Sequence, residues 1–343
     1  MKKLNVLHLL ASNKYSGAEN VACTIIKYTK NVNSFYCSPP GEIENTLKEQ
    51  NIKYIEINGL SVSRLKEIVI KYNIDIIHAH DFQASFFASF LYIDVDVISH
   101  IHCNYKLLKF RKLVSFVYSR IQHKFSKIFV VSKEILEDAS FGKKIKPKTL
   151  VLNNVVDEDK IIKLSKSFET NKYDLIFVGR LIELKQPLFF ISLVSELKKE
   201  KNNIKACIVG DGVLYKDCLD AINKNDLSAN IELMGFKSNP FPYIKNSKVT
   251  VMPSKFEGLP MSAVESLILD VPVVNSGVGG LKSMFMNYEE YICNDMKEYK
   301  DIILDILNNK TSALDCKNIR KEFTDIKGYS KKIEEIYKEV SSK

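Results

Sequence analysis

The chain has 343 residues, of which 45% are hydrophobic and 27% are charged, and its net charge is +9. This length suits two globular domains, and the composition excludes a fibrous or disordered protein. No apolar run reaches about 18 residues, so we expect no membrane-spanning helix, and scattered cysteines without a CxxC pair are typical of reduced thiols in the cytoplasm.

The first half of the chain alternates short apolar strands with amphipathic helices. The expected strands are 4–10, 53–57, 74–80, 95–102, 127–132 and 149–153. Their near-continuous runs of Ile, Val and Leu indicate strands that are buried on both faces, as in a parallel sheet covered by helices. Residues 1–160 are therefore expected to form one doubly wound α/β domain.

A second series of strands and helices begins near residue 173. Its expected strands are 173–179, 204–210, 231–235, 248–254 and 271–276. The polar stretch 155–172 carries no strand and separates the two series, so a second doubly wound domain is expected over 161–328. The amphipathic C-terminal helix, within 329–343, is expected to pack back on the first domain. Ligands of such sheets bind at the carboxyl ends of the strands.

The stretch EGLPMSAVE places Glu257 and Glu265 on either side of a helix start. Proline is favoured in the first turn of a helix, so the helix is expected to begin near Pro260. The unpaired backbone N–H groups around Gly258 and Leu259 would form a phosphate site, which the glycine lets a ligand approach closely. The two carboxylates would repel a phosphate, so we expect them to bind neutral hydroxyls at its two ends.

Arg180 and Lys185 follow the predicted strand 173–179 and would supply the positive charge that a diphosphate needs. Arginine offers a planar fork of donors and lysine a point charge. The alternative is a surface salt bridge, for instance between Arg180 and Glu183.

Several segments, in this order, resemble glycosyltransferase family four. They are SGAEN (16–20), DIIHAHDFQAS (75–85) with SHIH (99–102), VLNNVVD (151–157), FVGRLIELK with IVGDGVLY, and PSKFEGLPMSAVES, whose EGLPMSAVE matches the family's E-x7-E motif. The resemblance covers nearly the whole chain. It implies the GT-B fold, in which two Rossmann-like doubly wound domains face a central cleft.

The resemblance also implies roles for the matching residues. Arg180 and Lys185 would hold the nucleotide diphosphate. Glu265 would bind the ribose hydroxyls, and Glu257 would contact the transferred sugar as a catalytic residue. On the first domain, Gly17 would bring a backbone N–H to the phosphate.

His102 would lie near the anomeric centre, close to the acceptor, as the second catalytic residue that the resemblance implies. The chain departs from the family at three places. Ser16 stands where glycine is usual, residues 154–157 replace an N-G-x-D pattern, and Ser283 follows GVGG where an acidic residue is common.

Such enzymes are similar in retaining anomeric configuration and in needing no metal for donor binding, so we expect no cofactor. Asp94 and Asp96 resemble the DxD motif of metal-dependent transferases, but they lie at the start of a strand. A covalent route would need a carboxylate nucleophile, and Asp81 is the candidate near a strand end. We favour front-face attack, with the leaving phosphate assisting deprotonation of the acceptor and Arg and Lys stabilising its charge.

Four of the six histidines lie in pairs at strand ends, His78 with His80 and His100 with His102. Residues two apart share one face of a strand, so the pairs resemble a metal site. We expect none, because buried polar residues at strand ends usually hydrogen-bond to the backbone. His8 is expected to be a strand residue without a catalytic role.

The net positive charge comes from residues 1–150, which hold 22 Lys and Arg against 13 Asp and Glu, because the rest of the chain is balanced. Within residues 103–128, called the basic segment below, apolar residues recur at helical spacing and no acidic residue occurs. One reading is a core-facing stripe with a solvated basic face. The other is peripheral contact with an anionic membrane. No nucleic-acid partner is expected, because no known binding module is present.

The expected function is transfer of a sugar from a nucleotide-diphosphate sugar, UDP- rather than GDP-linked, to a glycan or lipid-linked acceptor in surface polysaccharide biosynthesis. Two alternatives remain open. One is a GT-B isomerase of the nucleotide-sugar 2-epimerase kind, which would add nothing to an acceptor. The other is an inactive GT-B partner subunit, which would be expected to lose Arg180, Lys185 or Glu257.

Overall fold

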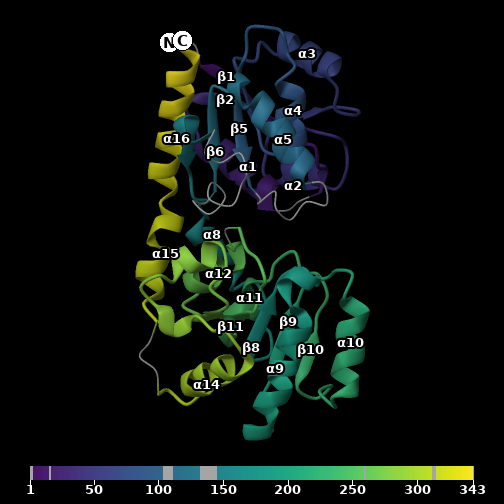
Figure 1. Ribbon diagram of the computed structural model, residues 1–343, viewed down its shortest axis with the longest axis vertical. Helices are drawn as coiled ribbons and strands as arrows, with labels where there is room; N and C mark the ends of the chain where they lie inside the picture. The colour runs from purple at the N-terminus through teal and green to yellow at the C-terminus, as the bar shows by residue number, and fades with distance from the viewer. Residues whose placement is uncertain are drawn as a thin grey trace. The chain divides into compact units, whose positions relative to one another are not determined.

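The computed structural model divides the chain into two compact units (Figure 1). Unit 1 comprises Met1–Val155 and Asp325–Lys343, and unit 2 comprises Val156–Thr324. The corresponding boundaries predicted from the sequence lie after residues 160 and 328. The structure describes residues 3–14, 17–102, 111–131, 145–258, 260–310 and 314–342.

Unit 1 is an α/β unit whose last helix comes from the C-terminal end of the chain. Its elements are β1 (Leu4–Leu9), α1 (Gly17–Tyr28), β2 (Val32–Ser38), α2 (Ile43–Glu49), β3 (Tyr54–Glu56), α3 (Val62–Lys71), β4 (Ile76–Ala79), α4 (Phe82–Ala88), β5 (Asp96–Ile101), α5 (Arg111–Ile121), η2 (Gln122–Lys124), β6 (Lys127–Val130), η3 (Lys146–Lys148), β7 (Thr149–Val151) and α16 (Ile326–Ser341).

The strands of unit 1 form one parallel sheet in the order β3-β2-β1-β4-β5-β6-β7. Alternate residues of its strands face opposite ways, as the pleat requires. Leu7 and Ile77 pack with residues of α3, α4 and α5, whereas Val6 and Ile76 pack with residues of α1 and α16. The C-terminal helix therefore covers part of the second face, beside α1.

Unit 2 repeats the architecture. Its elements are α8 (Glu158–Leu164), β8 (Tyr173–Val178), η4 (Glu183–Lys185), α9 (Pro187–Glu200), β9 (Ala206–Val209), α10 (Tyr215–Lys224), β10 (Ile231–Leu233), α11 (Phe241–Lys245), β11 (Ser247–Met252), α12 (Met261–Ile268), β12 (Val273–Asn275), α13 (Gly280–Met284), η5 (Glu289–Tyr291), α14 (Met296–Leu307) and α15 (Cys316–Thr324).

The parallel strands of unit 2 have the order β10-β9-β8-β11-β12. Both sheets therefore reverse their strand order next to the first strand, between β1 and β4 and between β8 and β11. In open α/β sheets, ligands bind outside the carboxyl ends of the strands at such a switch point.

One strand of unit 1, β2, was not predicted from the sequence. Its sequence, VNSFYCS, mixes polar with apolar residues, so it gives no apolar run. It is a strand because it pairs with β1 along its whole length, from Leu4 with Val32 to Leu9 with Cys37. The predicted position of the Asp94–Asp96 triplet at the start of a strand is confirmed, since β5 begins at Asp96.

Candidate active site

Two loops of unit 2 carry the charged residues that the sequence analysis selected. Gly179 and Arg180 follow β8, and Glu257 and Gly258 lie between β11 and α12. β8 and β11 are neighbours in the sheet, and both loops leave at the carboxyl ends of their strands. These residues therefore lie at the switch point of the second sheet.

Lys185 and Glu257 form an ion pair. Nζ of Lys185 donates to both carboxylate oxygens of Glu257 at 2.6 Å, and Oγ of Ser254 donates to Oε1 at 2.7 Å. The side chain of Glu257 is only 5% exposed. A buried carboxylate is unstable without a cation, and Lys185 provides it. The ammonium keeps one of its three donors, and the carboxylate one of its roughly four acceptor positions, for a ligand.

The loop after β12 supports Glu257 from the other side. Gly279 has φ +55° and ψ −132°, a combination confined to glycine, and a Cβ there would overlap the carbonyl oxygen of Glu257. Oγ of Ser276 donates to the carbonyl of Ser254 at 2.6 Å. No role was predicted for Ser254, Ser276 or Gly279, and the available signal was the GVGG stretch at 277–280, which follows a predicted strand.

Arg180 and Glu265 differ from this pair. Arg180 is exposed, and within the described residues its side chain makes no hydrogen bond or ion pair. The alternative pairing with Glu183 is wrong, because the carboxylate of Glu183 accepts from Nζ of Lys255 at 2.6 Å. Glu265 lies half-buried in the second turn of α12, and burial raises the pKa of its carboxyl to about 7. Such a group can donate to or accept from a hydroxyl.

The predicted helix start near Pro260 is confirmed, since α12 begins at Met261 directly after it. The carbonyl of Gly258 accepts from the amide of Gly280 at 2.9 Å, which ties the loop before α12 to the loop after β12. Leu259 lies outside the described residues. The first amides of α12 have no partner inside the helix by its geometry, which is the basis of the predicted phosphate site.

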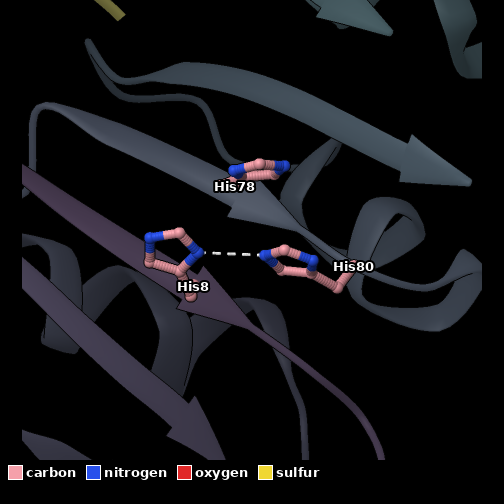
Figure 2. A group of neighbouring side chains, drawn as sticks. All are labelled: His8, His78 and His80. Carbon is pink, nitrogen blue, oxygen red and sulfur yellow. Dashed lines mark hydrogen bonds between the residues drawn. The ribbon is translucent and has the colours of Figure 1, made fainter. Parts of the chain in front are cut away.

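Unit 1 carries a row of histidines on one face of its sheet. His8 on β1 is in register with His78 on β4, and His100 lies on β5. His80 and His102 follow at the carboxyl ends of β4 and β5. In Figure 2 the rings of His8 and His80 point at one another, and the ring of His78 lies beside them. Because residues two apart share a face, this row lies on the side that packs against α1 and α16.

The histidines hydrogen-bond to one another rather than to the backbone, which corrects the sequence-based expectation. Nδ1 of His8 and Nε2 of His80 are 3.0 Å apart, and Nδ1 of His80 and Nε2 of His102 are 3.1 Å apart. Three rings thus form a chain across three strands. His8 takes part in it, a contact that the sequence analysis did not predict and that the register with β4 brings about.

A second chain runs beside the first. Nε2 of His78 and Nδ1 of His100 are 3.1 Å apart, and Nδ1 of His78 lies 2.7 Å from the hydroxyl of Tyr337 on α16. Burial lowers the pKa of every imidazole in the row, to about 3 for His8 and His102. The rings are therefore neutral at pH 7, each with one donor and one acceptor nitrogen.

The other residues selected in unit 1 have clear local positions. His102 is half-buried, and Gly17 is the first residue of α1, where backbone amides have no partner within the helix. Asp81 caps α4, and its two oxygens accept from the amides of Ala84 and Ala11, each at 2.7 Å. This commits the carboxylate to backbone groups, which argues against a nucleophile.

The described part of the basic segment begins with α5, and residues 103–110 lie outside the described structure. Val114 packs against the core, as the core-facing reading predicts. Leu113 and Phe116 on the same helix are 61% and 56% exposed, and the guanidinium of Arg120 lies 4.9 Å from the centre of the Phe116 ring. No helix in the described part of the chain has both the length and the apolar character needed to cross a membrane.

Comparison with known proteins identifies families whose sequence models match this chain. The family model of the group 1 glycosyl transferases matches residues 158–323, and that of Glycosyltransferase Family 4 matches residues 44–160. The chain is 27% identical over 292 residues to the capsular polysaccharide biosynthesis glycosyltransferase CapH of Staphylococcus aureus, covering 80% of this chain and 82% of CapH.

The chain is also 31% identical over 168 residues to a Campylobacter jejuni N-acetylgalactosaminyltransferase named for a diphospho-undecaprenol acceptor, covering 48% of this chain and 45% of that enzyme. Among solved structures, Anabaena HepE in complex with UDP and glucose aligns with a TM-score of 0.84 at 17% identity, covering 98% of this chain and all of HepE. This likeness shows the fold, which is GT-B with two Rossmann-like domains. The two family models, which together span residues 44–323, show that the chain belongs to the family four glycosyltransferases.

Proposed function

We propose that the chain transfers a sugar from a UDP-sugar to a glycan or lipid-linked acceptor during surface polysaccharide assembly, with retention of anomeric configuration. The observation that carries this proposal is the Lys185–Glu257 pair, together with the exposed Arg180 on the loop that follows β8. The names of CapH and of the Campylobacter enzyme support the setting, and the UDP in the HepE structure supports the donor.

The charged side chains of unit 2 have different roles in donor binding. Two of the three donors of Lys185 are taken by Glu257, so its remaining N–H contacts one diphosphate oxygen. Arg180 supplies the larger part of the net positive charge and stabilises the leaving diphosphate, without a metal. The free acceptor position of Glu257 takes a hydroxyl of the transferred sugar, and Glu265 takes a ribose hydroxyl.

Retention requires that the acceptor oxygen bonds to the face of the anomeric carbon that the diphosphate leaves. With Asp81 committed to two backbone amides, front-face attack is favoured over a covalent intermediate. The departing phosphate oxygen takes the acceptor proton. Within unit 1, Gly17 and His102 are proposed to contact the phosphate and the reacting sugar, as the family resemblance implies.

A nucleotide panel tests the donor site. Thermal unfolding is measured with UDP, GDP and their sugars, with and without EDTA. We expect UDP compounds to stabilise the protein equally in both conditions, and Arg180→Ala to abolish the stabilisation while Lys199→Ala, an exposed lysine on α9, leaves it intact. Full stabilisation of Arg180→Ala by UDP would refute the donor site.

Exposed apolar residues and nearby cations on unit 1 support contact with a membrane that carries a lipid-linked acceptor. Leu113 and Phe116 expose apolar surface beside Arg120, and Nζ of Lys124 lies 5.0 Å from the ring centre of Tyr92, which is 84% exposed. Apolar side chains rimmed by cations suit the surface of an anionic bilayer. We expect sedimentation with vesicles containing phosphatidylglycerol, lost in Leu113→Glu/Phe116→Glu and unchanged in Leu219→Glu, an exposed leucine in unit 2. Equal sedimentation of the two would contradict the membrane contact.

The mass of the product separates transfer from the alternatives. A transferase adds a sugar to the acceptor and releases UDP, whereas an epimerase changes the donor and leaves the acceptor mass unchanged. A partner subunit would bind UDP without turnover.

A further inference from the structure

We propose that unit 1 holds a divalent transition-metal ion of the zinc class on His80, His100 and His102. One nitrogen from each ring lies within 4.8 Å of the others. The inference goes beyond the proposed function, with which it shares His102, and it does not rest on the donor-binding loops of unit 2.

The distances require only small side-chain movements. Zinc bound to imidazole nitrogens at about 2.0–2.1 Å in a tetrahedron separates those nitrogens by about 3.3 Å. Nδ1 of His80 and Nε2 of His102 are already 3.1 Å apart, and the ring centres of His100 and His102 are 3.9 Å apart. Three nitrogen ligands leave a fourth position for water, as zinc sites with an open position do.

The neighbouring rings orient two of these ligands. Nε2 of His80 faces Nδ1 of His8, and Nδ1 of His100 faces Nε2 of His78. His78 in turn contacts the hydroxyl of Tyr337. Histidines that bind metals usually donate their second ring N–H to such a partner, which fixes the tautomer and the ring plane.

The hydrogen bonds that a metal would displace distinguish this set from the other set of three, His8 with His78 and His80. Nε2 of His100 is buried without a hydrogen-bond partner among the described residues, and leaving a buried polar atom unpaired is costly, so this ring gains from a ligand. The one hydrogen bond that would be displaced joins two of the ligands, His80 and His102. In the other set, both nitrogens of His78 are engaged, with His100 and with Tyr337.

The protons balance without a further reactant. Each neutral imidazole keeps one proton, which moves to the nitrogen that faces away from the metal. In His80 this is Nε2, which donates to His8, and in His100 it is Nδ1, which donates to His78. In His102, whose Nε2 faces His80, the proton is on Nδ1. His102 is half-buried at the end of β5, which gives the ion a path to the site.

The test uses the full chain without a polyhistidine tag, freed of metal by a chelator and dialysed. Zinc binding is measured by competition with a chromophoric chelator. We expect one equivalent per chain, because both sets of three share His80. His100→Gln and His102→Gln should weaken binding about 100-fold or more, and the supporting variants His8→Gln and His78→Gln about 10-fold. The exposed His123→Gln should bind like wild type.

Cobalt tests the ligands in the wild-type protein, so the result does not depend on how the variants fold. We expect an intense visible spectrum typical of four-coordinate cobalt and no sulfur-to-metal charge-transfer band, which would indicate cysteine ligands. Stoichiometric zinc binding by His102→Gln, a sulfur band, or no binding by the wild type would each overturn the proposal. The EDTA-independent binding of UDP reports on unit 2 separately, so the two proposals can fail independently.

Discussion

The two units share the order of their first five strands but carry different side chains at their switch points. Beside β8 and β11, charged side chains lie on loops beyond the strand ends, and Arg180 is exposed. Beside β1 and β4, neutral imidazoles lie within and directly after the strands, beneath α1 and α16. A fold supplies the edge at which ligands bind, and the side chains placed there decide the chemistry.

Burial explains why the two regions differ. A charged side chain that stays partly hydrated can bind a diphosphate. A buried imidazole loses its charge and binds a ligand through a nitrogen lone pair. The buried charge of Glu257 in the second region is compensated by Lys185. We therefore expect the stability of unit 2 to depend on charged side chains at its switch point. The stability of unit 1 should depend on hydrogen bonds between neutral side chains.

The largest effect on stability is expected from Lys185→Ala. It leaves the carboxylate of Glu257 buried without its cation, which should lower the free energy of unfolding of unit 2 by about 3 kcal/mol. Urea unfolding followed by hydrogen exchange separates the two units. Lys255→Ala breaks the exposed pair with Glu183 in the same region and should cost below about 1 kcal/mol.

A double variant tests the same point from the other side. Lys185→Met with Glu257→Gln removes both charges and should recover most of the lost stability. It should not recover stabilisation by UDP. If Lys185→Ala and Lys255→Ala cost the same, the pair is not a buried one, and the contrast between the units fails.

Gly279→Ala is the next largest. The new methyl group would overlap the carbonyl oxygen of Glu257 at a backbone conformation confined to glycine, which should cost about 2 kcal/mol or more. Gly235, with φ +67° and no atom within 4 Å of an added Cβ, is the matched control. Gly235→Ala should cost about 1 kcal/mol, from the positive φ alone. A smaller loss for Gly279→Ala would show that the loop yields.

Glu265→Gln should change stability in a pH-dependent way. Because the folded pKa, about 7, exceeds the ordinary value of 4.5, the folded state binds a proton more tightly than the unfolded state. Wild-type stability therefore falls as pH rises from about 4.5 to 7. Glutamine mimics the protonated carboxyl, so the variant should gain at most about 3 kcal/mol over wild type at pH 8 and nothing at pH 4. A constant difference across this range would contradict the raised pKa.

The smallest effect is expected in unit 1. Tyr337→Phe removes the hydroxyl that contacts His78 and should cost about 1 kcal/mol, independent of salt because no charge is involved. Tyr329 lies on the same helix with a buried hydroxyl that has no partner among the described residues. Tyr329→Phe should therefore be neutral or stabilising in urea unfolding. If both variants lost the same free energy of unfolding, the hydrogen bond between Tyr337 and His78 would not contribute to stability.

Much of the fold and part of the candidate site follow from local patterns. Strands buried on both faces are visible as apolar runs, and Pro260 marks the start of α12. The strand β2 was missed because it depends on pairing with β1. The Lys185–Glu257 pair was missed because the two residues lie 72 positions apart and were assigned to different parts of the donor.

The sequence by itself determined two doubly wound units, the helix start at Pro260 and the residue types available at the strand ends, because these depend on periodicity and local backbone preference. Only the tertiary structure decided which of those residues meet. Register put His8 beside His78, and loop packing put Gly279 against Glu257. Burial then decided which groups keep a charge, because the cost of desolvation depends on what surrounds a residue in the folded protein and not on its position in the chain.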